Sequence, residues 1–316
     1  MSFELLRARS SELGSPMRVD APERGVFTVG AVQCAWDSDP ARHAANLADG
    51  VRAAVAAGAQ LVCTQELTLS PYFAIDERLA EDARQYRERI PDGPTTELAR
   101  ALAMETGAAV QASLYEEPDD DSELGFNTAI CVGSDGELLA RTRKLHIPAF
   151  PGYQEHLCFA PGDTGFPVVD VGGARAGFPT CWDQWFPELA RAYSLLGAEI
   201  LVYPTAIGDE PEYGDFDSQP MWEQMIAANG LANATFMVAV NRIGTESGQS
   251  FYGSSFISDP YGRVLVRAPR ERAAVLVAEL DLDQRRDWLR FGLLNTRRPE
   301  IYWPLTDLEL HEAALQ

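Results

Sequence analysis

Cys181 is the residue of this chain best placed for covalent chemistry. It lies in GFPTCWDQWFPE (residues 177–188), where an apolar, strand-like run ends and a helix is predicted to begin at once. A thiol at such a turn is close to backbone N–H groups, which stabilise a thiolate and can hold an oxyanion. The position therefore suits a nucleophile. The alternative is a buried structural cysteine, because free Cys is among the most buried residue types.

Two charged residues also follow predicted strands. Glu66 comes directly after the apolar segment 61–65, and Lys144 comes after a predicted hairpin, in RTRKLHIP (residues 141–148). In open α/β sheets, residues at strand ends converge on one site. A carboxylate base, a cation and a thiol can thus meet at one point. For each residue alone, a solvated strand end is the simpler interpretation.

The elements that must position these residues alternate along the chain. Apolar runs and turn signals predict strands at 26–34, 59–63, 108–115, 127–132, 137–141, 200–203, 236–241, 253–258, 263–266 and 274–280, and one more leading into Cys181. Helical spacing predicts helices at 40–58, 94–106, 187–196 and 221–235. Interleaved strands and helices with some antiparallel hairpins indicate an α/β layered fold with mixed sheets.

Composition limits the class of protein. The 316 residues are 46% hydrophobic, which is ample for a core, and the net charge of −21 argues against sequence-independent nucleic-acid binding. We find no apolar stretch long enough to cross a membrane. The five cysteines form no C-x-x-C pair, so we expect neither a disulfide framework nor a metal site, and a reducing cytoplasm fits best. Residues 1–25 are predicted to be a flexible arm and residues 26–316 a single domain.

The motifs resemble those of the nitrilase superfamily of carbon–nitrogen hydrolases. CTQELTLSPYF, RTRKLHIP and FPTCWDQWFPELAR match the family's Glu, Lys and Cys motifs in order and spacing, over about residues 25–305. In PGYQEHLCFAPGD (residues 151–163), Glu155 aligns with a second family glutamate that orients the lysine, and a surface glutamate is the alternative. The resemblance implies an αββα sandwich that forms a homo-oligomer through helices next to the site and a C-terminal tail.

The resemblance also implies a mechanism. Glu66 acts as the general base for Cys181, and Lys144 with a backbone N–H, that of Trp182, stabilises the oxyanion before water resolves a thioester. This scheme requires no metal and no cofactor. The residues expected to bind the substrate are Tyr72, His146, Trp182 and Asp183. A structural role for His146 is nearly as plausible as one on the pocket wall.

Within the superfamily, CWDQWFPE is most similar to the N-carbamoylputrescine amidase branch. Relatives that hydrolyse N-carbamoyl amino acids typically carry an arginine just after the nucleophile, whereas this chain has Gln184 and Trp185. Acids that follow in the sequence favour an amine-tailed substrate or merely solvate a loop; they are Asp183, Glu210, Glu212, Asp215 and Asp217.

We therefore expect a cytoplasmic amidohydrolase that cleaves N-carbamoylputrescine to putrescine, CO2 and NH3. An N-carbamoyl-β-alanine or N-carbamoyl amino acid amidohydrolase, or an ω-amidase, is the alternative on the same residues. A more distant alternative is a non-catalytic binding scaffold, which the intact trio of Glu66, Lys144 and Cys181 disfavours.

Overall fold

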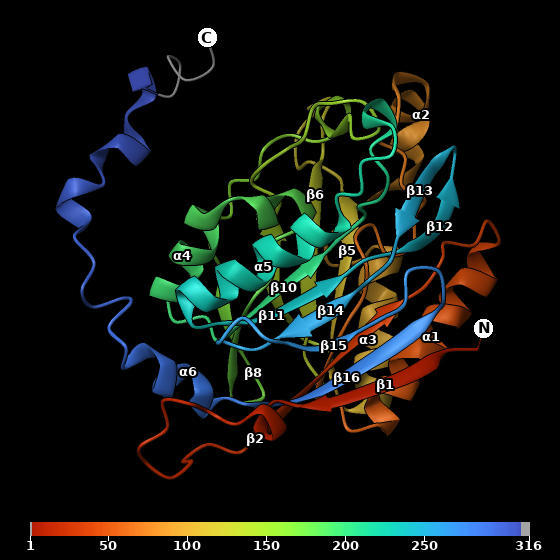
Figure 1. The fold of residues 1–316 in the computed structure, drawn as a ribbon. Helices are drawn as coiled ribbons and strands as arrows, with labels where there is room; N and C mark the ends of the chain where they lie inside the picture. The colour runs from red at the N-terminus through yellow and green to blue at the C-terminus, as the bar shows by residue number, and fades with distance from the viewer. Residues whose placement is uncertain (1, 311–316) are drawn as a thin grey trace.

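The computed structural model describes residues 2–310 and contains two large β-sheets (Figure 1). The first sheet has the order β1 (Glu4–Arg9), β16 (Ala274–Asp281), β2 (Val26–Gln33), β3 (Leu61–Cys63), β5 (Ala109–Glu116), β6 (Phe126–Val132) and β7 (Leu138–Arg143), with β4 (Arg87–Glu88) pairing β5. The second has the order β15 (Val264–Arg267), β14 (Phe256–Ser258), β11 (Phe236–Val240), β10 (Ile200–Pro204), β9 (Ala174–Gly177) and β8 (Val168–Val171). A separate hairpin joins β12 (Ile243–Glu246) and β13 (Gln249–Tyr252).

Each sheet has a parallel centre flanked by antiparallel pairs, and in the first sheet the edge strand β1 pairs in parallel with β16. Strands β2, β3 and β5 are parallel in the first sheet, and β9, β10 and β11 are parallel in the second. Parallel strands need crossover connections, so the loops that leave their carboxyl ends gather at one edge. The loop after β3 carries Glu66 and the loop after β9 carries Cys181, which brings both residues to such an edge.

Helices cover the outer faces of both sheets (Figure 1). Helices α1 (Pro40–Ala56) and α3 (Pro94–Thr106) contact the first sheet, and α4 (Pro187–Leu195) and α5 (Gln219–Asn233) lie over the second. The side chain of Asp39 caps α1 by accepting from two backbone N–H groups, and Gly107 ends α3 in the left-handed conformation. The layers are therefore helix, sheet, sheet, helix, which confirms the predicted αββα sandwich.

The remaining helical segments are short. They are α2 (Glu77–Asp82), α6 (Asp283–Leu289) and 3-10 turns at Ser10–Leu13, Ala83–Tyr86, Glu155–Leu157, Cys181–Trp185, Pro211–Tyr213, Pro299–Ile301 and Trp303–Thr306.

The main hydrophobic core lies between the two sheets. Val29, Leu61 and Leu276 of the first sheet and Val202 and Val238 of the second belong to one buried cluster and are fully inaccessible to solvent. All five residues lie in strands predicted from the sequence, because residues buried on both faces of a sheet give continuous apolar runs. This core fixes the two sheets relative to each other.

The predicted flexible arm over residues 1–25 is corrected in part. Residues 4–9 form the edge strand β1, parallel to β16, and Ser10 is fully buried. Further on, Arg18 forms ion pairs with Asp281 and Asp287 at 2.7 Å. The sequence did not predict this strand because the segment contains charged residues. An edge strand needs only one buried face, and Glu4–Arg9 alternates between half-buried and exposed positions.

Replacing Leu276 by alanine tests the inter-sheet core. We expect Leu276→Ala to lower the free energy of unfolding by about 2–5 kcal/mol, because the deletion leaves a cavity in a fully buried cluster. The matched control is Leu5→Ala, on an exposed position of β1, which should change it by less than about 0.5 kcal/mol. Equal effects in denaturant unfolding would contradict this description of the core.

Candidate active site

Glu66 is held in a tight turn just beyond the end of β3. The next residue, Leu67, has a φ of 49°, which a branched side chain rarely adopts, and its N–H donates to Ser113 Oγ at 3.1 Å. Glu66 itself is fully buried. The backbone therefore turns sharply at this point and directs the carboxylate into the protein.

Lys144 lies between two carboxylates. Its Nζ is 3.0 Å from Glu66 Oε1 and 2.7 Å from each carboxylate oxygen of Glu155, and all three residues are fully buried. The predicted pairing of Lys144 with Glu66 and Glu155 is thus present in the structure. Burial alone would lower the pKa of Lys144, but the charges of Glu155 and Glu66 outweigh it and raise that pKa, so the side chain remains an ammonium.

Two neutral side chains complete the cluster. Asn127, at the start of β6, donates from Nδ2 to Glu66 Oε1 at 2.7 Å, and Tyr72 donates from its hydroxyl to Glu155 Oε1 at 3.0 Å. Burial raises the pKa of Glu155 to about 7, and the charge of Glu66 adds to this against the opposing ammonium of Lys144. The hydrogen bonds hold both carboxylates in fixed orientations around one cation.

Cys181 is the first residue of the 3-10 turn that follows β9. Its φ of 41° is in the left-handed region, and its side chain is 5% exposed. The charges of Glu66, Lys144 and Glu155 act on the sulfur. Burial, followed by the charge of Glu66, raises the pKa of this thiol well above its usual value. Cys181 is thus close enough to the Glu66–Lys144–Glu155 cluster for its charges to act on the sulfur.

Asp183 connects the nucleophile turn to the lysine segment. One carboxylate oxygen accepts from the N–H of Thr180 at 3.1 Å, and the other accepts from the N–H and the Nδ1–H of His146 at 2.9 and 2.7 Å. Asp183 is 1% exposed. Asp183 therefore links the loop of Cys181 to the segment after Lys144, and it is not among the residues that line the cavity described below. Its predicted role in substrate binding stays a prediction.

The side chains of His146 and Tyr72 are both engaged by neighbouring residues of the protein. The His146 ring stacks on Phe186 with centroids 3.7 Å apart, and its Nδ1 is engaged by Asp183. The Tyr72 hydroxyl is engaged by Glu155. Of the four residues predicted to bind substrate, only Trp182 is among the residues that line the neighbouring cavity described below.

A buried ion pair on the β12–β13 hairpin fixes the Glu66 loop from outside. Arg242 is fully buried and donates to the carbonyl oxygens of Glu66 and Leu67 at 2.6 and 3.2 Å. Its other terminal nitrogen is 2.6 Å from Glu246, which accepts from the N–H of Tyr72 at 2.8 Å. Sequence reasoning assigned no role to Arg242, Glu246 or Asn127. The sequence shows each of them only as a charged or polar residue near an apolar segment, which does not indicate a role in the site.

A cavity of about 460 Å³ begins at the residue after the cysteine. Its lining residues are Phe150, Trp182, Trp185, Glu210, Tyr213, Phe216, Ser218 and Met221. The wall is mainly aromatic and carries one carboxylate. Its volume lies within the usual range for small-molecule sites.

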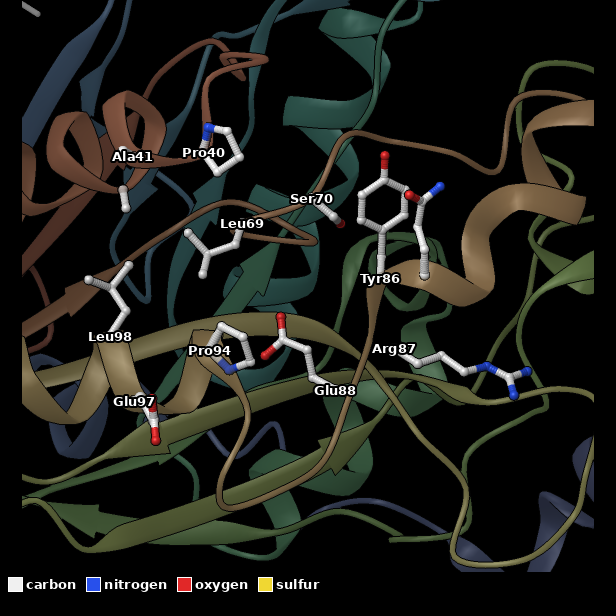
Figure 2. A pocket seen from close by; sticks show the side chains of 12 residues that line it. Pro40, Ala41, Leu69, Ser70, Tyr86, Arg87, Glu88, Pro94, Glu97 and Leu98 are labelled. Carbon is white, nitrogen blue, oxygen red and sulfur yellow. The ribbon is translucent and has the colours of Figure 1, made fainter.

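A larger cavity lies elsewhere in the described chain. Figure 2 shows this hollow of about 720 Å³, which Leu69, Tyr86, Glu88 and Pro94 help to line. None of Glu66, Lys144 and Cys181 contributes to it. A choice of functional site by cavity volume alone would therefore miss the cluster that contains the reactive groups.

Residues 2–310 contain neither a metal-binding cluster nor a membrane-spanning helix. No group of three or more His, Cys, Asp or Glu side chains in this part of the chain is arranged to hold a metal ion. None of its helices has both the length and the apolar composition to cross a membrane.

Known proteins resemble this chain over most of its length. It is 40% identical to an N-carbamoylputrescine amidase of Solanum lycopersicum, covering 92% of this chain and 98% of the relative. It is 36% identical to a citrullinase of Francisella tularensis subsp. tularensis, covering 87% and 96%. A crystal structure of a carbon–nitrogen hydrolase from Helicobacter pylori G27 superimposes with a TM-score of 0.77 at 29% identity, covering 90% of this chain and 99% of that one.

The family model described as carbon-nitrogen hydrolase matches residues 28–290. This range includes Glu66, Lys144, Glu155 and Cys181. The chain belongs to the carbon–nitrogen hydrolase family, whose members act on C–N bonds other than peptide bonds.

Proposed function

We propose that this protein hydrolyses the ureido C–N bond of N-carbamoylputrescine, releasing putrescine, CO2 and NH3. The observation that carries the proposal is the buried cluster in which Lys144 contacts Glu66 and Glu155 beside the thiol of Cys181. Similarity to N-carbamoylputrescine amidases at 40% identity supports the choice of substrate. The aromatic cavity with the carboxylate of Glu210 suits an amine-tailed urea.

In the first half-reaction, Cys181 attacks the ureido carbon. Because burial keeps the sulfur protonated, Glu66 takes the thiol proton as the S–C bond forms. The negative charge that develops on the carbonyl oxygen is stabilised by the Lys144 ammonium and the N–H of Trp182, in the first turn after the nucleophile, where N–H groups have no partner inside the helix. The C–N bond then breaks, and Glu66 returns the proton to the leaving nitrogen.

In the second half-reaction, water resolves the thioester-type intermediate. Glu66 accepts a proton from the water as its oxygen attacks the acyl carbon. The C–S bond then breaks, and Glu66 returns this proton to the departing sulfur, which regenerates the thiol of Cys181 and the carboxylate of Glu66. The product is a carbamic acid, which loses CO2. Glu155 and Asn127 orient Lys144 and Glu66 throughout, since both hold the cluster by direct hydrogen bonds.

A second substrate on the same residues is citrulline. The 36% identity to a citrullinase favours it, and citrulline carries the same ureido group as N-carbamoylputrescine. Its carboxylate has no basic partner among the described residues that line the cavity. We therefore rank N-carbamoylputrescine first.

We also propose a homo-oligomer that forms through the C-terminal segment. This segment runs away from the body of the protein in Figure 1 and exposes large apolar side chains, namely Phe291, Ile301, Trp303, Leu305, Leu308 and Leu310. Exposed apolar patches of this kind mark protein–protein contacts. A reducing cytoplasm remains our proposal for its location, supported by five free, buried cysteines.

Ammonia release tests the proposed reaction. We expect the wild-type protein to release ammonia from N-carbamoylputrescine faster than from N-carbamoyl-β-alanine, citrulline or an ω-amide. Cys181→Ala and Glu66→Gln should each lower kcat by at least about 100-fold, because they remove the nucleophile and the base. Thermal melting shows that each variant is folded. Release from none of the compounds would overturn the assignment, and a preference for carbamoyl acids would overturn the substrate.

The pH dependence of alkylation tests the state of the nucleophile. Since the pKa of Cys181 is raised, its rate of modification by a small neutral thiol reagent should rise continuously from about pH 6 to about pH 9. Mass spectrometry of the Cys181 peptide measures this rate. The control is Cys181→Ala, in which mass spectrometry of the whole protein should show no labelling, because the other four cysteines are only 0–2% exposed against 5% for Cys181. A plateau reached below about pH 7 would instead indicate a resting thiolate.

The oligomer is tested by light scattering after size-exclusion chromatography. We expect the double variant Trp303→Glu and Leu305→Glu to form a smaller assembly than the wild type, because charges on an apolar contact oppose its burial. Val19→Glu, at another exposed apolar position, is the matched control. A monomeric wild type, or an unchanged mass in the double variant, would contradict the proposal.

A further inference from the structure

A buried ion pair on the β12–β13 hairpin lies behind the turn that carries Glu66. Arg242, just before β12, has no exposed surface, and Glu246, at the end of β12, is 7% exposed. Nη1 of Arg242 lies 2.6 and 2.8 Å from the two carboxylate oxygens of Glu246. Because apolar side chains in place of a buried ion pair often leave a protein equally stable or more stable, stability alone does not account for this pair.

The other end of the Arg242 guanidinium contacts the Glu66 turn. Its Nη2 donates to the carbonyl oxygens of Glu66 at 2.6 Å, Leu67 at 3.2 Å and Ser70 at 3.4 Å. Within residues 2–310, the carbonyl oxygen of Glu66 accepts from no other group. A residue in the left-handed region, such as Leu67 with its φ of 49°, keeps that conformation only when surrounding contacts enforce it. Arg242 supplies such contacts on the outer side of the turn.

The second member of the pair acts on the second carboxylate of the site. Glu246 accepts from the backbone N–H of Tyr72 at 2.8 Å, and the Tyr72 hydroxyl donates to Glu155 at 3.0 Å. The ring of Phe251, on β13, packs edge-on against that of Tyr72 with centroids 5.7 Å apart. The same Phe251 ring has its centroid 5.5 Å from the guanidinium carbon of Arg242. The hairpin therefore fixes both the backbone and the ring of Tyr72.

One ion pair is thus connected to both carboxylates that contact Lys144. Arg242 holds the backbone of Glu66. Glu246 holds Tyr72, whose hydroxyl orients the second carboxylate. The proposed reaction requires the base to reach first the thiol and then the leaving nitrogen, and a misplacement of about 1 Å can lower a rate about 100-fold. The geometry of the ion pair therefore bears on the rate of the reaction.

We propose that Arg242 and Glu246 are positioning residues for catalysis, which set the carboxylates of Glu66 and Glu155 relative to Lys144. Neither contacts the substrate in this scheme. This inference rests on the proposed function, because it assigns how the base of that reaction is held. Loss of the pair should lower kcat and leave KM nearly unchanged, since no residue of the hairpin is among the described residues that line the substrate cavity.

The test uses the double variant Arg242→Gln and Glu246→Gln, which removes the pair without leaving an unpaired buried charge. We expect its kcat for N-carbamoylputrescine to fall at least about tenfold, with KM within about threefold of wild type. The single variant Arg242→Gln leaves Glu246 without its cation, so it should melt at a lower temperature than the double variant and have a kcat no higher. A kcat that recovers together with the melting temperature would show a purely structural role and overturn the proposal.

A second ion pair of similar design provides the matched control. Arg263 donates at 2.7 Å to Asp259, four residues before it, and also at 2.7 Å to the carbonyl oxygens of Leu13 and Gly14. Asp259 is fully buried, and the segment held by Arg263 carries no residue of the site. The double variant Arg263→Gln and Asp259→Asn should therefore keep kcat within about twofold of wild type. An equal loss of kcat in both double variants would contradict a specific role of the Arg242–Glu246 pair.

The conservative variant Arg242→Lys tests the hydrogen bonds to the turn. Lysine keeps a cation beside Glu246 and N–H donors for the Glu66 carbonyl oxygen, although it lacks the planar fork of arginine. Its kcat should lie below that of wild type and at least about threefold above that of the Arg242→Gln and Glu246→Gln double variant. A folded Arg242→Lys protein that shows no such recovery would contradict the proposal.

Hydrogen exchange separates this proposal from the proposed reaction. In peptides that cover residues 66–74, we expect at least about tenfold faster amide exchange in the Arg242→Gln and Glu246→Gln variant than in wild type or in the control, because the turn loses its contacts and Tyr72 loses a carboxylate acceptor. If wild type hydrolyses none of the compounds, the proposed reaction falls, and faster exchange in these peptides still supports the positioning role. Unchanged exchange would overturn that role. If N-carbamoylputrescine is hydrolysed and the variant keeps full kcat, the positioning role falls alone.

Discussion

The site depends on one buried ammonium placed between two buried carboxylates. Burial of Glu66 or Glu155 alone would be costly, and the 2.7–3.0 Å contacts with Lys144 are what offset that cost. In the proposed mechanism, the same ammonium stabilises the oxyanion that forms when Cys181 attacks the ureido carbon. Burial, followed by the charge of Glu66, raises the pKa of the neighbouring Cys181 thiol, so the proposed attack needs a base.

Two kinds of constraint in the fold hold the loops that carry these residues. Each reactive residue follows a strand in one of two packed sheets, which determines its approximate place. The second fixation comes from buried charges behind the loops: Arg242 holds the carbonyl oxygens of the Glu66 turn, and Asp183 joins the Cys181 turn to the segment after Lys144. These contacts let non-glycine residues keep positive φ values at the two turns that carry the base and the nucleophile.

Much of this could be predicted from the sequence, because continuous apolar runs reveal buried strands and strand ends reveal the edge where a site forms. The convergence of Glu66, Lys144 and Cys181 was expected on that basis and from the motifs. The contact of Asn127 with Glu66 could not be predicted. The two residues are 61 positions apart, and a single polar residue does not indicate which strand lies next to its own. For Asp183 a signal existed: Thr180 followed three residues later by an acid is typical of a helix start, where the acid accepts backbone N–H groups.

The central claim is that Cys181 forms a covalent bond with the substrate carbon while Lys144 and the two glutamates stay in place. Rapid-quench mass spectrometry of the peptide that contains Cys181, during turnover of N-carbamoylputrescine, tests it most directly. The account predicts a transient acyl adduct on Cys181 that forms and decays at rates compatible with ammonia release. Hydrolysis at full rate with no adduct on Cys181 at any time, or with the adduct on another residue, would contradict it.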